Sequence, residues 1–251
     1  MPSYPARAIV LRKTKLGEAD TIVTLLANDG HQIRAVAKGL RKTTSKFGGR
    51  LEPGTEVDLL LHTGRTLDVV SEARTVDSHV RVREDLDRQS ATAVVLDVLD
   101  KMSCEDEADP RLYGLAHATI AAIEHAEPAM LPTLVIAFLV KAMAMHGYRP
   151  ELELCVVCAQ DVDASGLFSF AAGGVVCESC GTDSGAIERF DPAARAWIDL
   201  LLRSTMAEVA ALDMPEGARV ECFALVRSFV AYHLPARLKA LDFYAGLAAP
   251  R

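Results

Sequence analysis

The sequence predicts an α+β protein in which a small closed β-barrel, residues 1–80, is followed by an α-helical domain, residues 81–251. Three observations support this fold class. Short β-branched runs fill the first 80 residues, the apolar spacing then becomes helical, and two cysteine pairs interrupt the helical pattern at about residues 150–188. Half of the 251 residues are apolar and 24% are charged, so the chain can bury a sizeable core.

Five runs of alternating or β-branched residues predict the strands of the barrel. They cover residues 6–13, 20–27, 31–38, 55–62 and 66–76. Asn28, Asp29 and Gly30 supply the positive-φ positions of a tight hairpin turn between the second and third runs. Closure of five strands removes the exposed edges of an open sheet, although an SH3-like barrel fits this periodicity equally well.

Helical spacing begins near Glu84 and predicts five helices, at residues 85–104, 110–126, 128–146, 192–210 and 219–241. Asp109 and Asp191 each precede a proline, which places an N-cap carboxylate before a proline at the first helical position. Pro235 predicts a kink or break in the last helix. The most apolar helix is shorter than the roughly 20 residues that span a bilayer, so we expect it to be a core helix.

The two cysteine pairs predict one structural zinc ion per chain. Cys155 and Cys158 are separated from Cys177 and Cys180 by 18 residues, a spacing typical of a site made of two zinc knuckles. Four thiolates fill the tetrahedron of zinc and leave no position for a substrate. A rubredoxin-like iron site and four unrelated buried cysteines are the alternatives.

An alternative metal site uses a different set of residues. His125 and Glu127, followed by Cys155 and Cys158, are similar to the pattern of zinc deaminases. This pattern has proline where the sequence has Leu154, and it leaves the second cysteine pair unused. The remaining cysteines, Cys104 and Cys222, are expected to be small core residues of their helices.

Positive charge is concentrated near the N-terminus. Residues 1–80 contain 12 Lys or Arg and 9 Asp or Glu, whereas residues 81–251 contain 15 and 25. No acidic residue lies between Asp29 and Glu52, a segment that contains six cations, Arg34, Lys38, Arg41, Lys42, Lys46 and Arg50. Such a cluster suits a phosphate backbone, and a solvated basic loop is the alternative.

Three segments of this region resemble the N-terminal signature of RecO proteins, bacterial recombination mediators of the RecF pathway. They are Leu16–Leu26 (LGEADTIVTLL), Ala35–Gly39 (AVAKG) and Ser45–Pro53 (SKFGGRLEP). The resemblance extends over the whole chain, through the helical domain and its four-cysteine zinc module. It implies that the N-terminal barrel is an OB-fold and that the chain is not an enzyme.

The resemblance also implies a function in DNA repair and homologous recombination. It implies binding of single- and double-stranded DNA through the six cations, strand annealing, and partnership with RecR and the single-strand-binding protein SSB. It further implies loading of RecA onto SSB-coated DNA, in association with the nucleoid. The apolar stretch near the N-terminus is too short for a secretory signal, so we expect a cytoplasmic protein. A zinc-knuckle transcription regulator is the alternative function. Because Tyr4 and Phe47 are the only aromatic residues of the barrel, we expect backbone electrostatics to dominate DNA binding.

The acidic C-terminal tail of SSB ends in apolar residues, so its receptor needs an apolar groove beside a cation. The helical domain is the predicted receptor because it supplies apolar helix faces. Arg227 is the predicted cation, since it is spaced along its helix to flank the apolar residues Phe223, Val226, Val230 and Leu234. The alternative is that these apolar residues belong to an ordinary core.

Overall fold

A computed structural model of the chain describes residues 2–162, 167–181 and 187–248, which form two compact units. Unit 1 consists of Met1–His125 and Leu238–Arg251, and unit 2 consists of Ala126–Arg237. Unit 1 therefore contains the barrel together with helices. The domain boundary near residue 80 stays a prediction.

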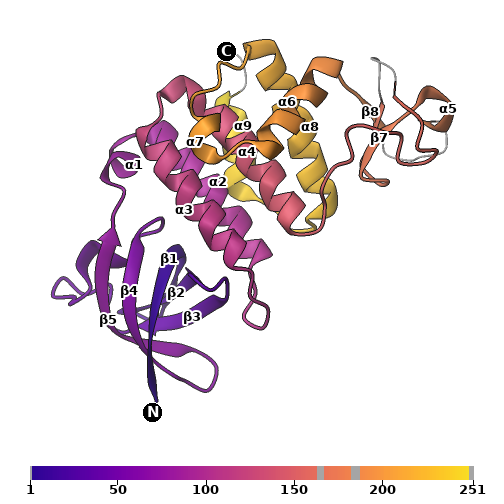
Figure 1. Ribbon diagram of the computed structural model, residues 1–251. Helices are drawn as coiled ribbons and strands as arrows, with labels where there is room; N and C mark the ends of the chain where they lie inside the picture. The colour runs from indigo at the N-terminus through magenta and orange to yellow at the C-terminus, as the bar shows by residue number, and fades with distance from the viewer. Residues whose placement is uncertain (1, 163–166, 182–186, 249–251) are drawn as a thin grey trace. The chain divides into compact units, whose positions relative to one another are not determined.

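Five strands close the N-terminal barrel of unit 1 (Figure 1). They are β1 (Ser3–Leu16), β2 (Asp20–Ala27), β3 (Gln32–Ala37), β4 (Glu56–His62) and β5 (Asp68–Asp77). Their order around the barrel is β1-β2-β3-β5-β4, and β1 is long enough to pair with both β2 and β4. This five-stranded closed barrel confirms the predicted N-terminal fold, and all five predicted strands are present.

Alternation along the strands builds the barrel core. On β3, Ala35 and Ala37 are buried and Ile33 is half-buried, whereas Arg34 is exposed, as the period of two predicts. The short 3₁₀ helix η1 (Gly48–Leu51) contains Arg50, the last cation of the basic segment, and buries Leu51 in the same core. The exposed cations therefore project from a surface whose opposite side is packed.

Four helices complete unit 1: α1 (Val80–Glu84), α2 (Leu86–Met102), α3 (Pro110–His125) and α9 (Lys239–Ala248). The buried His79 joins the end of the barrel to α3, since its Nδ1 lies 2.7 Å from Oε2 of Glu124. Asp85 caps α2 by accepting a bond from the backbone N–H of Arg88. The backbone N–H of Ala240 on α9 donates to Asp97 on α2, so the end of the chain returns to unit 1.

Unit 2 is built around the apolar helix α4 (Leu131–Met145), which follows the 3₁₀ helix η2 (Pro128–Met130). The helices α6 (Pro192–Arg203), α7 (Met206–Val209) and α8 (Glu216–His233) pack against α4. The 18-residue window Pro128–Met145 is long and apolar enough to cross a membrane, but 61% of it is buried. This burial confirms the prediction of a core helix.

Two predicted helices differ from the structure in their extent. The helix predicted to end near residue 210 stops at Arg203, and Thr205 with Glu208 forms a capping box that starts the separate helix α7. The break predicted near Pro235 is complete, so α8 and α9 are distinct helices in different units.

The remaining cysteines have different environments. The prediction of a core position is wrong for Cys104, which is exposed just after α2 ends. It is confirmed for Cys222, which is buried on α8, and burial raises the pKa of its thiol to about 12.

The four-cysteine module lies in unit 2. It contains three short strands, β6 (Leu167–Ser169), β7 (Gly174–Val176) and β8 (Ile187–Arg189), and one short helix, α5 (Glu178–Gly181). β6 is the central strand and pairs with both others. Phe168 on β6 meets Phe229 on α8 edge to face, with ring centroids 5.7 Å apart, which fixes the module to the helices of unit 2. Residues 163–166 and 182–186 of the predicted module lie outside the described residues.

Candidate metal centre and nucleic-acid interface

The first cysteine pair is held by a tight turn after α4. The backbone N–H of Ala159 donates to the carbonyl of Cys155 at 2.8 Å, and the N–H of Cys155 donates to the carbonyl of Gln160. Ala159 adopts a φ of 57°, a left-handed conformation uncommon for a residue with a side chain. The turn thus brings the sulfurs of Cys155 and Cys158 to the same side.

Backbone hydrogen bonds join the first pair to the second. The N–H of Val156 donates to the carbonyl of Val175 at 3.0 Å, and Glu151 exchanges bonds with the chain around Gly174. A Cβ at Gly174 would lie 2.5 Å from the carbonyl oxygen of Glu151, so only glycine allows this approach. The β7 strand therefore delivers Cys177 directly to the first knuckle.

The sulfurs of Cys155, Cys158, Cys177 and Cys180 all lie within 4.8 Å of one another, and the Cys158–Cys177 distance is 3.8 Å. This separation is far longer than the roughly 2.05 Å of a disulfide. Four sulfurs placed about 2.3 Å from a tetrahedral metal ion are about 3.8 Å apart, so the cluster fits a metal. The four-cysteine cluster can hold one metal ion.

The electrostatics of the cluster also suit a cation. Desolvation would raise the pKa of the buried Cys155, but backbone N–H groups, those of Cys177 and Cys158 first, outweigh it and lower this pKa to about 6. Hydrogen bonds to the sulfurs of Cys177 and Cys158 raise the pKa of Cys180 to about 12. A bound divalent cation would deprotonate this last thiol as well, because coordination favours the thiolate.

The arrangement of the four cysteines differs from the one that a deaminase-like site needs. All four cysteines belong to one cluster, whereas that pattern needs only Cys155 and Cys158 beside a histidine. His125 ends α3, where its Nδ1 lies 2.9 Å from the carbonyl oxygen of Ala121, a contact that closes the last turn of the helix. The second cysteine pair completes a closed set of ligands.

The six cations of the basic segment are all exposed, but they lie along different parts of the barrel. Arg41 is fixed beside the β1–β2 hairpin, because its guanidinium donates to the carbonyl of Gly17 at 3.1 Å and its backbone N–H to that of Ala19. Lys46 lies over β5 and donates to the carbonyl of Ser71, and Arg50 donates back to the carbonyl of Lys46.

The other cations follow β3 and the turn after it. Arg34 lies on the outer face of β3 and Lys38 directly follows the strand, four residues later, a separation of up to roughly 13 Å. Lys38 and Lys42 make no ion pair with any residue in the described part of the chain. Positive charge therefore forms a band from β3 to the β1–β2 hairpin, with a second pair of cations over β5.

Strand pairing adds a cation that the linear segment does not contain. Lys15 on β1 pairs with Thr21, and Thr21 pairs with Ala37, the neighbour of Lys38. Paired residues lie in one row and share one face of the sheet, so the exposed Lys15 is about 10 Å from Ala37, on the opposite face from Lys38. The position of Lys15 relative to β3 can be worked out from the sequence only if the pairing register of the strands is known.

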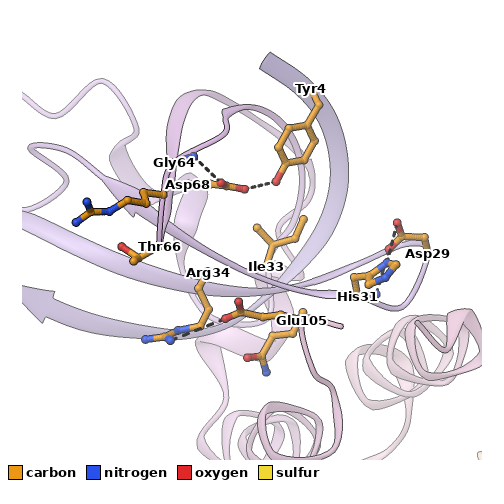
Figure 2. Close-up of a pocket in the computed structure, with 11 residues that line it drawn as sticks. Tyr4, Asp29, His31, Ile33, Arg34, Gly64, Thr66, Asp68 and Glu105 are labelled. Atoms are coloured by element: carbon orange, nitrogen blue, oxygen red, sulfur yellow. Dashed lines mark hydrogen bonds and ion pairs between the residues drawn. The ribbon is translucent and has the colours of Figure 1, made fainter. Parts of the chain in front are cut away.

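Aromatic side chains do not offer bases a stacking surface in the barrel. Phe47 is 1% exposed, and its ring lies 5.0 Å from the ammonium of Lys46. Tyr4 is half-buried and directs its hydroxyl at the carboxylate of Asp68 (Figure 2). The geometry of the barrel surface thus favours contacts to phosphates over contacts to bases.

The predicted cation of the SSB receptor belongs to α8. Arg227 is exposed there and Phe223 is half-buried. The other apolar residues of this prediction, Val226, Val230 and Leu234, are buried in unit 2. They therefore serve as core residues, and Arg227 as a partner-binding cation stays a prediction.

Comparisons with known proteins give one family. Residues 1–79 match the family profile described as "Recombination protein O N terminal", and residues 83–242 match "Recombination protein O C terminal". A protein of Bifidobacterium adolescentis named "DNA repair protein RecO" is 34% identical over 247 residues, covering 96% of this chain and 98% of the relative. Proteins of the same name from Frankia casuarinae and a Nocardioides species are each 37% identical, over 97% and 96% of the chain and 98% of each relative.

Proposed function

Because the chain belongs to the RecO family of DNA repair and recombination proteins, which are non-enzymatic mediators, we propose that its barrel binds DNA through the phosphate backbone. Single- and double-stranded DNA both present this backbone, so both are ligands. The bound protein anneals complementary strands, because it neutralises the charge that keeps two strands apart.

The observation that carries this proposal is the band of exposed cations on the barrel. Arg34, Lys38, Arg41, Lys42, Lys46 and Arg50 all project from a surface whose opposite side is closed by the barrel core. Such an array contacts phosphates without reading bases, which suits a protein that must act on any damaged sequence. A sequence-specific zinc-knuckle regulator would need contacts to base edges, and no feature of this surface favours them over phosphate contacts.

We also propose that the cysteine cluster holds one structural zinc ion. The separation of the sulfurs supports a tetrahedral ion, and four thiolates favour zinc among the metals of the cell. The ion would hold the two knuckles together and would take no part in a reaction. Iron in the same four-sulfur geometry is distinguished by its visible absorption.

The partners proposed for the chain follow from its family. They are RecR, the acidic tail of SSB and, functionally, RecA on SSB-coated DNA, and the proposed location is the cytoplasm near the nucleoid. For the SSB tail, the proposed receptor is the helical part of the chain, with Arg227 as the cation. Titration of a labelled tail peptide onto the full chain tests that residue, because normal binding to Arg227→Ala would remove it from the receptor.

Strand annealing tests the proposed function. Complementary oligonucleotides coated with SSB are mixed with the protein without ATP, and annealing is followed by fluorescence quenching. The wild-type protein is expected to accelerate annealing, and the variant Lys38→Gln/Arg41→Gln/Lys42→Gln to do so much less. Equal acceleration by the folded variant would place the DNA site elsewhere, and no acceleration by the wild type would contradict the proposal.

A further inference from the structure

An acidic loop from the helical part of unit 1 lies against the basic face of the barrel. The loop joins α2 to α3, and it contains four carboxylates within five residues, Glu105, Asp106, Glu107 and Asp109. In the sequence this loop is far from the basic segment. The fold places the acidic loop and the basic segment side by side, so their charges interact.

Backbone and amide hydrogen bonds anchor the start of this loop to β3. The backbone N–H of Gln32 donates to the carbonyl of Cys104 at 2.9 Å. The side-chain amide of Gln32 donates to the carbonyl of Asp100 at 3.2 Å and to the hydroxyl of Ser103 at 3.1 Å. The loop is therefore positioned by Gln32, independently of any attraction between charges.

The end of the loop is fixed by close packing on the β2–β3 turn. Gly30 has a φ of 95°, and a Cβ on this residue would overlap the backbone atoms of Asp109. Only glycine permits both the conformation and the approach. Asp109 also caps α3, since its carboxylate accepts from the backbone N–H of Arg111 at 3.0 Å. Both ends of the acidic loop are thus tied to their neighbours.

The anchored loop holds Glu105 beside Arg34, with 3.9 Å between the carboxylate and the guanidinium (Figure 2). Both residues line a pocket of about 390 Å³ at this end of β3. The pocket is also lined by Asp29, Arg65 and Asp68, so its three carboxylates outnumber its two guanidinium groups. A phosphate approaching Arg34 would meet these carboxylates at short range, where like charges repel.

The opposite end of β3 has a different balance. Lys38 and Lys42 have no ion-pair partner among the described residues, and Lys15 lies in the neighbouring row of the sheet. This end also carries two carboxylates, those of the exposed Glu18 and of Asp20, which accepts a backbone hydrogen bond from Gly39 at 2.7 Å, so cations still outnumber carboxylates there. Phosphates are therefore favoured at the hairpin end of β3 and disfavoured at the pocket end.

We propose that the acidic α2–α3 loop is an electrostatic stop, which means that its negative charge ends the path of DNA along the barrel. This inference rests on the proposed DNA binding. The loop withholds Arg34 from the phosphate backbone and confines DNA to the side of Lys38, Arg41 and Lys42. The ion pair between Arg34 and Glu105 is exposed, and such pairs are individually weak, so the loop acts through its anchored position and its summed charge.

The test neutralises the loop and measures how DNA affinity depends on salt. Glu105→Gln/Glu107→Gln removes two charges and keeps Asp109, which caps α3. Affinity for a labelled oligo-dT is measured by fluorescence anisotropy across a range of sodium chloride concentrations. Glu84→Gln/Asp87→Asn is the matched control, because it removes two exposed carboxylates of unit 1 outside the loop.

With Arg34 released, the loop variant is expected to gain one phosphate contact. The slope of log K against log salt should steepen by about 0.7, which corresponds to roughly fivefold tighter binding at about 0.1 M salt. In an Arg34→Gln background the same loop variant should not steepen the slope. Arg34→Gln alone should change the affinity less than twofold.

Two results would overturn the stop. One is equal steepening with and without Arg34, and the other is equal steepening by the control pair, since either would reflect general charge alone. If the wild-type protein shows no salt-dependent DNA binding, both the DNA-binding proposal and the proposed role of the loop are contradicted. The two failures are thus distinguishable in one set of titrations.

Discussion

The four cysteines of unit 2 and the six cations of unit 1 are both closely spaced in the sequence, but the fold arranges them in opposite ways. The cysteine sulfurs converge to within 4.8 Å of one another across an 18-residue separation. The cations fall within 17 consecutive residues, and they are spread from β3 to the β1–β2 hairpin and to β5.

The difference matches what the two proposed ligands require. A metal ion demands donors at one point, so backbone turns and Gly174 are organised to bring the sulfurs together. A phosphate backbone is an extended line of charge, so separated cations serve it, and their neighbours decide which of them are available. The convergence of the cysteine sulfurs can be predicted from a sequence motif. Whether a cation is available to a phosphate depends on residues far away in the sequence, such as Glu105.

Loss of a cysteine should have the largest effect. Cys177→Ser is expected to abolish stoichiometric zinc and to lower the free energy of unfolding of unit 2 by on the order of 5 kcal/mol, because metal binding contributes directly to folding. Elemental analysis and thermal unfolding measure the two effects. Cys104→Ser is the matched control, since Cys104 is exposed outside the cluster.

Native protein purified without chelators should contain about one zinc per chain. Protein with no stoichiometric metal would contradict the metal site itself. Stoichiometric iron with the absorption of a four-sulfur site would instead support the rubredoxin-like alternative.

The next largest effect on stability is expected where the acidic loop packs on the barrel. Gly30→Ala is expected to lower the free energy of unfolding of unit 1 by roughly 2–3 kcal/mol, because alanine is strained at a φ of 95° and its Cβ overlaps Asp109. Gly17→Ala is the control, with a φ of 58° and no neighbour within 4 Å, and should cost about 1 kcal/mol. Equal losses in denaturant unfolding would mean that the loop does not pack tightly on Gly30.

Most of the fold could be predicted because periodicity and turn residues are local signals. The runs rich in Ile, Val and Thr became β1 to β5, and proline after aspartate marked the starts of α3 and α6. The early end of α6 was missed because the capping box of Thr205 and Glu208 competes with continued helical spacing. The return of α9 to α2 is a tertiary contact, on which helical periodicity carries no information.

The four-cysteine cluster could be predicted from the sequence, and the charge balance of the barrel could not. Cysteine spacing is sufficient because few other arrangements use two such pairs. The segment between Asp29 and Glu52 contains no acidic residue, but the fold supplies Glu105 to Arg34 from a loop about 70 residues away. Lys15 was missed for the same reason, since its place beside β3 depends on strand register.

A smaller effect is expected in how the stability of unit 2 depends on pH. Burial against rings that include Tyr148 and Phe229 lowers the pKa of His233. The unfolded state then binds more protons near its ordinary pKa of about 6.5, so stability is lost as pH falls through that value. His233→Phe should reduce this loss of stability in denaturant unfolding between pH 7 and 5, and an unchanged pH profile would contradict the assignment.

The central claim is that DNA binds to the barrel as a phosphate backbone. Its most direct test is the salt dependence of binding to single-stranded DNA, for which five phosphate contacts, with Arg34 withheld, give a slope of about −3.5. Arg41→Gln/Lys42→Gln/Lys46→Gln should flatten the wild-type slope by about 2 units while the fold persists. The control Arg81→Gln/Lys101→Gln/Lys239→Gln, which also removes three exposed cations of unit 1, should leave the slope nearly unchanged. Equal flattening by both variants, or an unchanged slope in the folded barrel variant, would contradict the claim.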